Sequence, residues 1–308
     1  MNCELTHALH FTVENKGAKL LGRVPCVVQL PFQDYIDKQF NDRSIYNIAL
    51  AEFGETWADD ILSEMDPDVI IGAGIEGLVD NQKIEARGYT SVNGNMLANK
   101  DFLDFDDPKG RFNIFACIPL VMVVDKTQAN GRQIPRKFSD VLSEEYENSV
   151  VYPDDGHMLD SILLTYIYKD LGDEGLNQFK RNVFGGAHPS QMIKPGGLEK
   201  KPFIMLMPWV FARLKAMQPN MELIWPEDGA PILPIVVTSK NNESAKSFTE
   251  VLFRKEVGDI FRGNGFFPSN ATETDNKLPG KLSFIGWDYI YRDDLIDIIA
   301  HCKSVIEE

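Results

Sequence analysis

The stretch FNIFACIPLVMVV, residues 112–124, decides how the chain is organised. It is a long apolar run that Pro119 interrupts, and a second extended run, PILPIVV, follows at residues 231–237. We predict that the first run carries the chain from one lobe into another and that the second run brings it back. A first lobe then holds residues 1–115 and 240–308, and a second lobe holds residues 116–239.

Outside these two runs, strand-like apolar segments alternate with helical patterns, which is typical of an α/β fold with mostly parallel sheets. The carboxyl ends of such strands form the crevice in which open α/β sheets bind ligands. Strands are predicted at 25–30, 68–71, 149–152, 203–207 and 222–225. Helices are predicted at 34–40, 45–65, 158–168, 209–217, 245–253, 255–262 and 293–305.

Composition bounds the class of protein. The chain has 308 residues, of which 44% are hydrophobic, and this is enough for more than one core. Its formal net charge is −15, and so acidic a surface repels phosphate backbones, which excludes nucleic acid as a partner. The same charge either favours a cationic solute or only keeps the protein soluble, and the sequence leaves both readings open.

The four cysteines, Cys3, Cys26, Cys117 and Cys302, lie far apart, with neither a zinc-type spacing nor a disulfide framework. No segment approaches the ~20 apolar residues of a membrane span. The first residues lack the basic and apolar regions of a signal peptide. We therefore expect either a periplasmic or cell-surface protein whose leader has been removed, or a cytoplasmic protein.

A set of short motifs resembles one known family. The motifs are PRKFSDVL at 135–142, VVYPD at 150–154, LLTY at 163–166, LGDEG at 171–175, DPDVI at 66–70 and WPEDG at 225–229. Their order and spacing resemble the type II periplasmic-binding-protein family, in the cluster of iron, polyamine and thiamine binders. The resemblance implies a two-lobed, hinge-bending solute-binding protein of an ABC-type importer, which is no enzyme and carries no cofactor. Its implied partners are a small-molecule or ion solute and the membrane subunits of the importer, and we expect a monomer.

The chain departs from this family at one informative place. Ferric-ion binders of the cluster place two adjacent tyrosines before a helix of the second lobe, and the matching stretch here is LMPWV, residues 206–210. Met207 and Trp209 offer no hard anionic oxygen to Fe³⁺. A tyrosinate iron site is therefore not expected. Both side chains instead suit an apolar or aromatic part of a ligand, or ordinary core packing.

The strongest local candidate for the crevice is DDGH, residues 154–157. It lies between a strand and a helix, where free backbone N–H groups attract polar or anionic groups. Asp155, Gly156 and His157 are therefore predicted to contact the solute, although an aspartate here can also serve only as the helix N-cap. One histidine beside two carboxylates is too little to predict a metal site.

Each of the remaining candidates for solute contact rests on a single feature of the sequence. Glu227 and Asp228 can meet an amine or cation, or can lie in an exposed turn. Cys26 and Cys117 can line the crevice, but a lone cysteine on an apolar strand is more often a small buried hydrophobe. Gly74 belongs to a GxGxxG stretch, residues 72–77, which we interpret as a strand-to-helix turn and not as a dinucleotide site.

Two other functions stay open. A cytoplasmic ligand sensor would use the same crevice. An enzyme on the same fold would need a nucleophile or an acid/base pair, with Cys117, Cys26, His157 and Asp155 as the residues to test.

Overall fold

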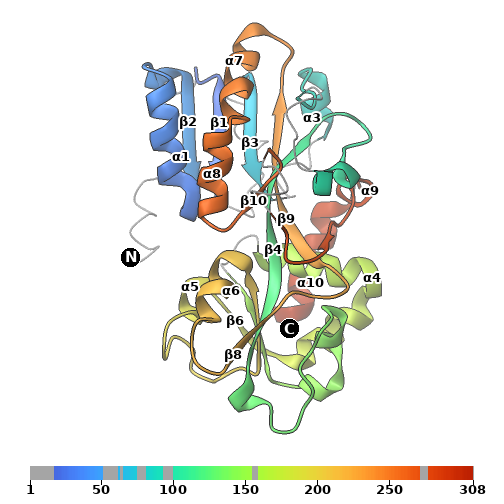
Figure 1. Cartoon of the computed structure of the whole chain (residues 1–308). Helices are drawn as coiled ribbons and strands as arrows, with labels where there is room; N and C mark the ends of the chain where they lie inside the picture. The colour runs from blue at the N-terminus through green and yellow to red at the C-terminus, as the bar shows by residue number, and fades with distance from the viewer. Residues whose placement is uncertain are drawn as a thin grey trace.

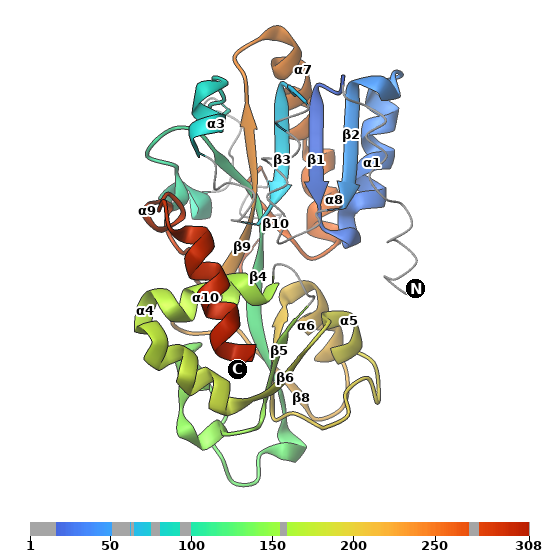
Figure 2. The same cartoon turned by 180° about the vertical axis from the view of Figure 1, so that it is seen from behind.

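The computed structural model of the chain describes residues 17–50, 62, 65–74, 81–92, 100–154, 159–270 and 277–307. Figures 1 and 2 show two lobes, one above the other, with long strands that run from one lobe into the other. Helices flank the strands in both lobes. The predicted α/β class is therefore confirmed.

The upper lobe contains three parallel strands, β1 (Leu20–Val24), β2 (Tyr46–Leu50) and β3 (Val69–Ala73). β1 lies in the middle and pairs with both of the others. All residues of β1 and β3 are buried, as expected for parallel strands that are covered on both faces. Among the described residues, this lobe has the helices α1 (Cys26–Gln39), α3 (Asn81–Ala86), α7 (Glu243–Leu252) and α8 (Lys255–Gly263).

The lower lobe has a second parallel set, in which β5 (Val150–Pro153) pairs with both β6 (Val183–Ala187) and β7 (Ile204–Pro208). The other elements of this lobe are β8 (Met221–Ile224), α4 (Leu159–Asn182), α5 (Pro189–Met192) and α6 (Trp209–Lys215). Short 3-10 helices lie at Arg43–Ile45, Lys100–Phe105, Lys126–Gln128, Ser139–Leu142 and Glu144–Tyr146.

Two antiparallel strands join the lobes, β4 (Asn113–Asp125) and β9 (Ala230–Ser239). Residues 113–119 of β4 pair with β9, and residues 120–124 pair with β7. β10 (Phe267–Pro268) adds to the edge of β4 at Ala116 and Cys117. The extended runs predicted at 112–124 and 231–237 are thus the two strands that cross between the lobes (Figure 1).

The C-terminal segment lies along the side of these crossing strands. β11 (Leu282–Ser283) pairs with β9, and α9 (Trp287–Ile290) and α10 (Leu295–Glu307) follow. α10 packs against α4, a helix of the lower lobe. The division into lobes at residues 115 and 240 stays a prediction. It assigns α10 to the first lobe, whereas α10 packs against α4, which lies in the range predicted for the second lobe.

The strand predicted at 25–30 is wrong. Residues 20–24 form the strand, and α1 begins at Cys26. Val28, Phe32 and Ile36 are all buried, and their spacing of four residues is the period of a helix that packs on one face. Pro25 precedes the helix with a φ of −58° and a ψ of 146°, so the turn from strand to helix takes place at this residue.

The helix predicted at 45–65 is wrong in its first part. Tyr46–Leu50 is a strand, paired in register with Leu20–Val24 of β1. The backbone hydrogen bonds to β1 decide the conformation of this segment. The side-chain pattern that predicts a helix contains no information about this pairing. Residues 51–61 lie outside the described part of the chain.

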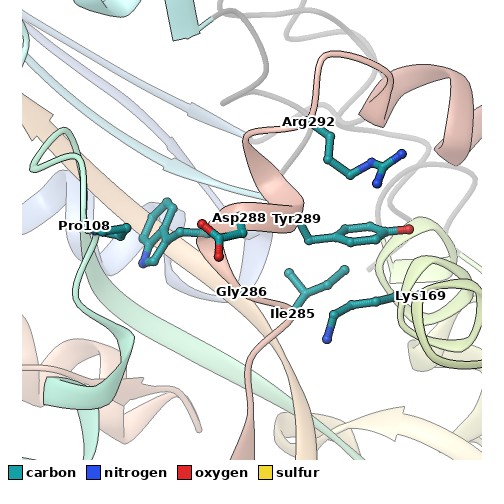
Figure 3. Close-up of a pocket in the computed structure, with 8 residues that line it drawn as sticks. Pro108, Lys169, Ile285, Gly286, Asp288, Tyr289 and Arg292 are labelled. Atoms are coloured by element: carbon teal, nitrogen blue, oxygen red, sulfur yellow. The ribbon is translucent and has the colours of Figure 1, made fainter.

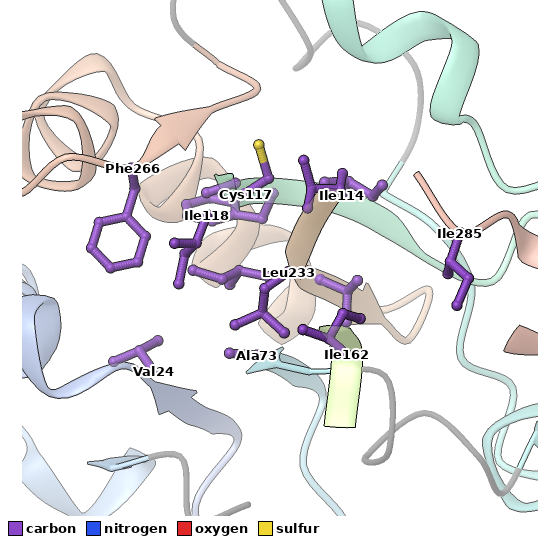
Figure 4. Close-up of a cluster of buried hydrophobic side chains, with 14 of the residues drawn as sticks. Val24, Ala73, Ile114, Cys117, Ile118, Ile162, Leu233, Phe266 and Ile285 are labelled. Carbon is purple, nitrogen blue, oxygen red and sulfur yellow. The ribbon is translucent and has the colours of Figure 1, made fainter. Parts of the chain in front are cut away.

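One hydrophobic core runs through both lobes. In Figure 4, Val24 and Ala73 come from strands of the upper lobe and Ile162 comes from α4, while Cys117 and Leu233 lie on the crossing strands between them. All five side chains are nearly or fully buried. The lobes are therefore held by shared apolar packing as well as by the two strands.

The turn after α8 touches the lower lobe at Gly265. This residue has a φ of +86°, and a Cβ added to it would lie 3.1 Å from the Cα and Cβ of Val210 in α6. We expect Gly265→Ala to lower the free energy of unfolding by about 1–3 kcal/mol, because the backbone conformation and the close contact both oppose a side chain. Urea unfolding followed by circular dichroism measures this change.

Gly263→Ala is the matched control two residues earlier. No atom lies within 4 Å of a Cβ built there, and Gly263 ends α8, so its replacement should leave stability unchanged or slightly raised. Equal unfolding midpoints for both variants would contradict the role assigned to Gly265.

Candidate functional site

The strand ends of both lobes arrive at one short stretch of β4. The last residue of β3, Ala73, pairs with Ile235 of β9, which in turn pairs with Ala116 of β4. The last residue of β7, Pro208, pairs with Leu120 of β4. Four residues of extended strand span about 13 Å. Carboxyl ends of two sheets that meet at such a crossing form the position at which α/β sheets bind ligands.

Trp209 lies at this position, as the first residue of α6 directly after β7. Its ring centroid is 5.4 Å from that of Trp225 and 6.1 Å from that of Phe267. Trp225 and Phe267 are 6.0 Å apart, with their rings nearly perpendicular. We call these three residues the hinge aromatic cluster. Trp209 is only partly buried, so one part of its indole stays available to a ligand.

The hinge aromatic cluster joins the lobes. Trp209 and Trp225 follow strands of the lower lobe, whereas Phe267 lies in β10, which pairs with Cys117 of β4 beside the upper lobe. The indole N–H of Trp225 donates a hydrogen bond of 2.8 Å to the carbonyl oxygen of Lys281. This bond fixes the orientation of the ring against which Trp209 packs.

Cys26 and Gly74 mark the strand ends of the upper lobe. Cys26 is exposed and is the first residue of α1, which follows β1. Gly74 follows β3 with a φ of +94°, and its N–H donates a hydrogen bond of 3.0 Å to the carbonyl oxygen of Pro234. The positive φ accounts for a glycine at the turn after this strand. The rest of the GxGxxG stretch, residues 75–77, lies outside the described residues.

Cys117 and Met207 are placed differently from the prediction. Both side chains have no exposed surface, so neither reaches a solute in this conformation. Cys117 is one of the buried side chains of the shared core (Figure 4), and burial raises the pKa of its thiol far above the usual value. Met207 packs with Val121 and Met205 in a smaller cluster of the lower lobe. The strands that carry these residues are covered on both faces, so their side chains do not face the crevice.

Asp228 and Glu227 serve a local structural purpose. The carboxylate of Asp228 accepts hydrogen bonds from the N–H groups of Phe138 and Ser139, at 2.7 and 3.1 Å, and from the Ser139 hydroxyl at 3.0 Å. The N–H of Glu227 donates to the carbonyl oxygen of Arg136 at 2.9 Å. The Asp228 oxygens thus hold the start of a 3-10 helix, and contact of Glu227 and Asp228 with a cationic solute stays a prediction.

Asp155, Gly156 and His157 lie outside the described residues. The residue before them, Asp154, follows β5 and lies against Gly186 of β6, where an added Cβ would be 2.3 Å from the Asp154 Cβ. Gly186 thus leaves the space that this aspartate occupies. The sequence pattern did not indicate this pairing, because the two residues are neighbours only across the parallel ladder.

Two features are absent from the described part of the chain. It contains no group of three or more His, Cys, Asp or Glu side chains arranged to hold a metal ion. None of its helices is both long enough and apolar enough to cross a membrane.

The placement of the cysteines predicts their reactivity. Only the thiolate attacks a disulfide reagent, and burial raises the pKa of Cys117 strongly and that of Cys302 to about 12. In a Cys3→Ser background at about pH 8, near the usual thiol pKa, we expect fast reaction of Cys26 alone. With an aromatic disulfide as the reagent, each reacting cysteine releases an aromatic thiol, and the absorbance of this thiol measures the rate.

The control is Cys26→Ser in the same background, which should remove the fast phase and leave only slow reaction of Cys117 and Cys302. A fast phase that persists in this variant would show that one of the buried thiols is open to solvent.

Comparisons with known proteins agree with this geometry. The family described as bacterial extracellular solute-binding protein matches residues 65–293. Among solved structures, the Trichodesmium protein IdiA (FutA), in complex with iron and citrate, is 15% identical with a TM-score of 0.63 and covers 94% of this chain and 98% of its own. The ferric binding protein from Campylobacter jejuni has the same identity, score and coverage.

A third solved structure, of an ABC transporter protein from Clostridium perfringens, is 13% identical with a TM-score of 0.64 and covers 93% of this chain and 99% of its own. No curated protein sequence matches the chain significantly. At these identities the solved structures establish the fold, which is the predicted two-lobed type II periplasmic-binding-protein fold. The family match extends over well more than half of the chain, and the protein therefore belongs to the bacterial extracellular solute-binding protein family.

Proposed function

We propose that this protein captures a small solute between its two lobes and delivers it to an ABC-type importer. The observation that carries the proposal is the arrival of the strand ends of both lobes at residues 116–120 of β4. A solute held there touches both lobes at once. It therefore stabilises the closed arrangement by its greater affinity for that state.

The hinge for this motion is the pair of crossing strands. The crossing strands carry Pro119 in β4 and Pro231 and Pro234 in β9, and Pro208 ends β7 beside them. Proline has no N–H to donate to a ladder, so hydrogen bonding between the strands is thinnest at this place. A β-bulge between Ile114 and Ala116 interrupts the ladder once more. Both features favour bending here.

The proposed solute has a flat or apolar part that packs on Trp209. Among the described residues directly after strands, Pro25, Cys26, Gly74 and Trp209 offer no anionic oxygen, and Asp154 after β5 offers a single carboxylate. The Trichodesmium protein named above binds iron and citrate, and the Campylobacter protein is a ferric binding protein. Trp209 in place of a tyrosine supports an organic solute over bare ferric ion in this chain.

The remaining parts of the proposal follow from this role. The partners are the solute and the membrane subunits of the importer, the protein works as a monomer, and its place is the periplasm or the cell surface. No catalytic step is proposed, and the raised pKa of the buried Cys117 thiol makes this cysteine a poor nucleophile. Cys26, Gly74 and Trp209 are the described residues proposed to line the crevice, and Asp155, Gly156 and His157 remain proposed with them.

Native mass spectrometry of the gently purified protein tests the proposal. We expect a mass above that of the denatured chain, with the difference released on denaturation and identified as one small solute. Titrated back, this solute should bind Trp209→Ala about tenfold or more weakly than the wild type, because an aromatic contact of this size is lost. Circular dichroism should show that the variant stays folded.

Leu214→Ala is the matched control on the same helix, since Leu214 is exposed further along α6, away from the strand ends. It should bind the solute as the wild type does. A protein that carries no solute and shows no thermal shift in a broad metabolite screen would contradict the proposed function. Equal affinity in all three proteins would contradict the placement of the crevice at Trp209.

A further inference from the structure

The turn after α8 brings the upper lobe against α6 of the lower lobe. In both Figure 1 and Figure 2, α6 and α8 lie on one side of β4, and α4, α9 and α10 lie on the other. A Cβ added to Gly265 would lie 3.1 Å from Val210 and 3.2 Å from the guanidinium carbon of Arg213. Both of these residues belong to α6, so the lobes touch on the side where α6 begins with Trp209.

Arg213 is the charged residue at this contact. It lies four residues after Trp209 and therefore shares one face of α6 with it. Its Nη2 donates to the carbonyl oxygen of Gly263 at 3.4 Å, which is long beside the usual distance of about 2.9 Å. Its Nε is buried and has no hydrogen-bond partner among the described residues. In this conformation the guanidinium is thus close to an acceptor on the other lobe but poorly bonded to it.

The end of α8 offers the acceptors that Arg213 lacks. Gly263 is the last residue of this helix and Asn264 is its C-cap. Within the described part of the chain, no backbone N–H donates to the carbonyl oxygen of either residue. The C-terminal end of a helix also carries a partial negative charge, which attracts a cation. The last turn of α8 is therefore a suitable partner for a guanidinium group.

The cations on the other side of the crossing are already matched. Figure 3 shows Lys169 and Arg292 beside the pocket between α4 and α9. Lys169 lies 3.8 Å from a carboxylate oxygen of Asp170, and Arg292 donates to Asp294 at 2.8 and 2.7 Å. Among the described residues, Arg213 has no carboxylate within ion-pair distance. Its charge is therefore left to interact with the end of α8.

Closure of the lobes would complete this contact. The proposed hinge is the pair of crossing strands, so a rotation that narrows the crevice at Trp209 also moves the turn after α8 toward α6. A shift of about 0.5 Å brings the bond between Nη2 and Gly263 to the usual length. Gly265 has no side chain to obstruct this approach.

We propose that Arg213 is a closing latch, whose guanidinium bonds the carbonyl oxygens at the end of α8 when the lobes close on the solute. The inference rests on the proposed function and adds a residue that acts on the solute without touching it. Arg213 is thus a positioning residue, which stabilises the closed state alone. Because the latch forms after the solute has entered, it slows dissociation and leaves association unchanged.

Stopped-flow tryptophan fluorescence of Arg213→Met tests the latch, with the solute recovered from the denatured wild type as the probe. Methionine keeps an apolar stem and removes the donors. We expect dissociation to be about tenfold or more faster than in the wild type, because charge-assisted hydrogen bonds of the closed state are lost. The association rate should not change. Arg213→Lys, which keeps the charge without the planar fork, should lie between the two proteins.

Arg292→Met is the matched control, because it removes an arginine that is paired with Asp294 on the opposite side of the crossing. It should release the solute at the wild-type rate. Equal dissociation rates in Arg213→Met and the wild type would overturn the latch and leave the proposed function intact. A wild type that binds no solute would overturn the proposed function, and the latch with it.

Urea unfolding without solute separates a latch from an ordinary structural bond. Arg213→Met should unfold at the wild-type midpoint or slightly above it, because the buried Nε has no partner to lose. A midpoint lowered by more than that of Arg292→Met would show that Arg213 already holds the solute-free structure together. That result would overturn the latch whether or not a solute has been found.

Discussion

The pairing of β4 with two different sets of strands is the constraint on which the rest of the structure depends. Its first half pairs with β9 and its second half with β7 and β8. In the lower lobe, β7 runs antiparallel to β4 and so ends at the crossing. In the upper lobe, β3 runs antiparallel to β9, which itself runs antiparallel to β4, so β3 also ends at the crossing. The meeting of strand ends, and with it the position of the proposed crevice, follows from the opposite directions of the two crossing strands, β4 and β9.

At the crossing, interrupted strand pairing coincides with extensive apolar packing. Prolines and a bulge remove ladder hydrogen bonds, while the shared core and the hinge aromatic cluster fill the space around the same residues. Hydrogen bonds are directional and resist bending, whereas apolar contacts tolerate small rotations because many orientations bury similar areas. Packing can thus hold the lobes together while the backbone remains able to bend. The segment from α9 to α10 adds a third link, with Trp287 packed on Phe112 and α10 packed on α4.

Much of the fold could be predicted from short-range patterns. The crossing runs, β7 with α6, and the helices α7, α8 and α10 appear as apolar periods with clear ends, and the predictions for them agree with the structure. The failures lie at residues 25–30 and 46–50. Val27, Val28 and Leu30 favour a strand by composition, but the spacing of Val28, Phe32 and Ile36 decides for a helix. Tyr46–Leu50 becomes a strand only because β1 lies beside it.

Within the candidate site, the sequence placed Trp209 at the start of a helix after a strand, where the structure has it. It could not separate Trp209 from Met207, because burial depends on which strands flank β7. It also could not indicate Phe267 as a partner of Trp209, since no local pattern reports a contact between residues of different lobes. The positions of strands and turns depend on neighbouring residues in the sequence. Burial on both faces of a strand, and contacts across the hinge, depend on how distant segments pack together. Residues just after a strand end are therefore better candidates for ligand contact than residues within a fully buried strand, because the sheet cannot cover the end of its own strand.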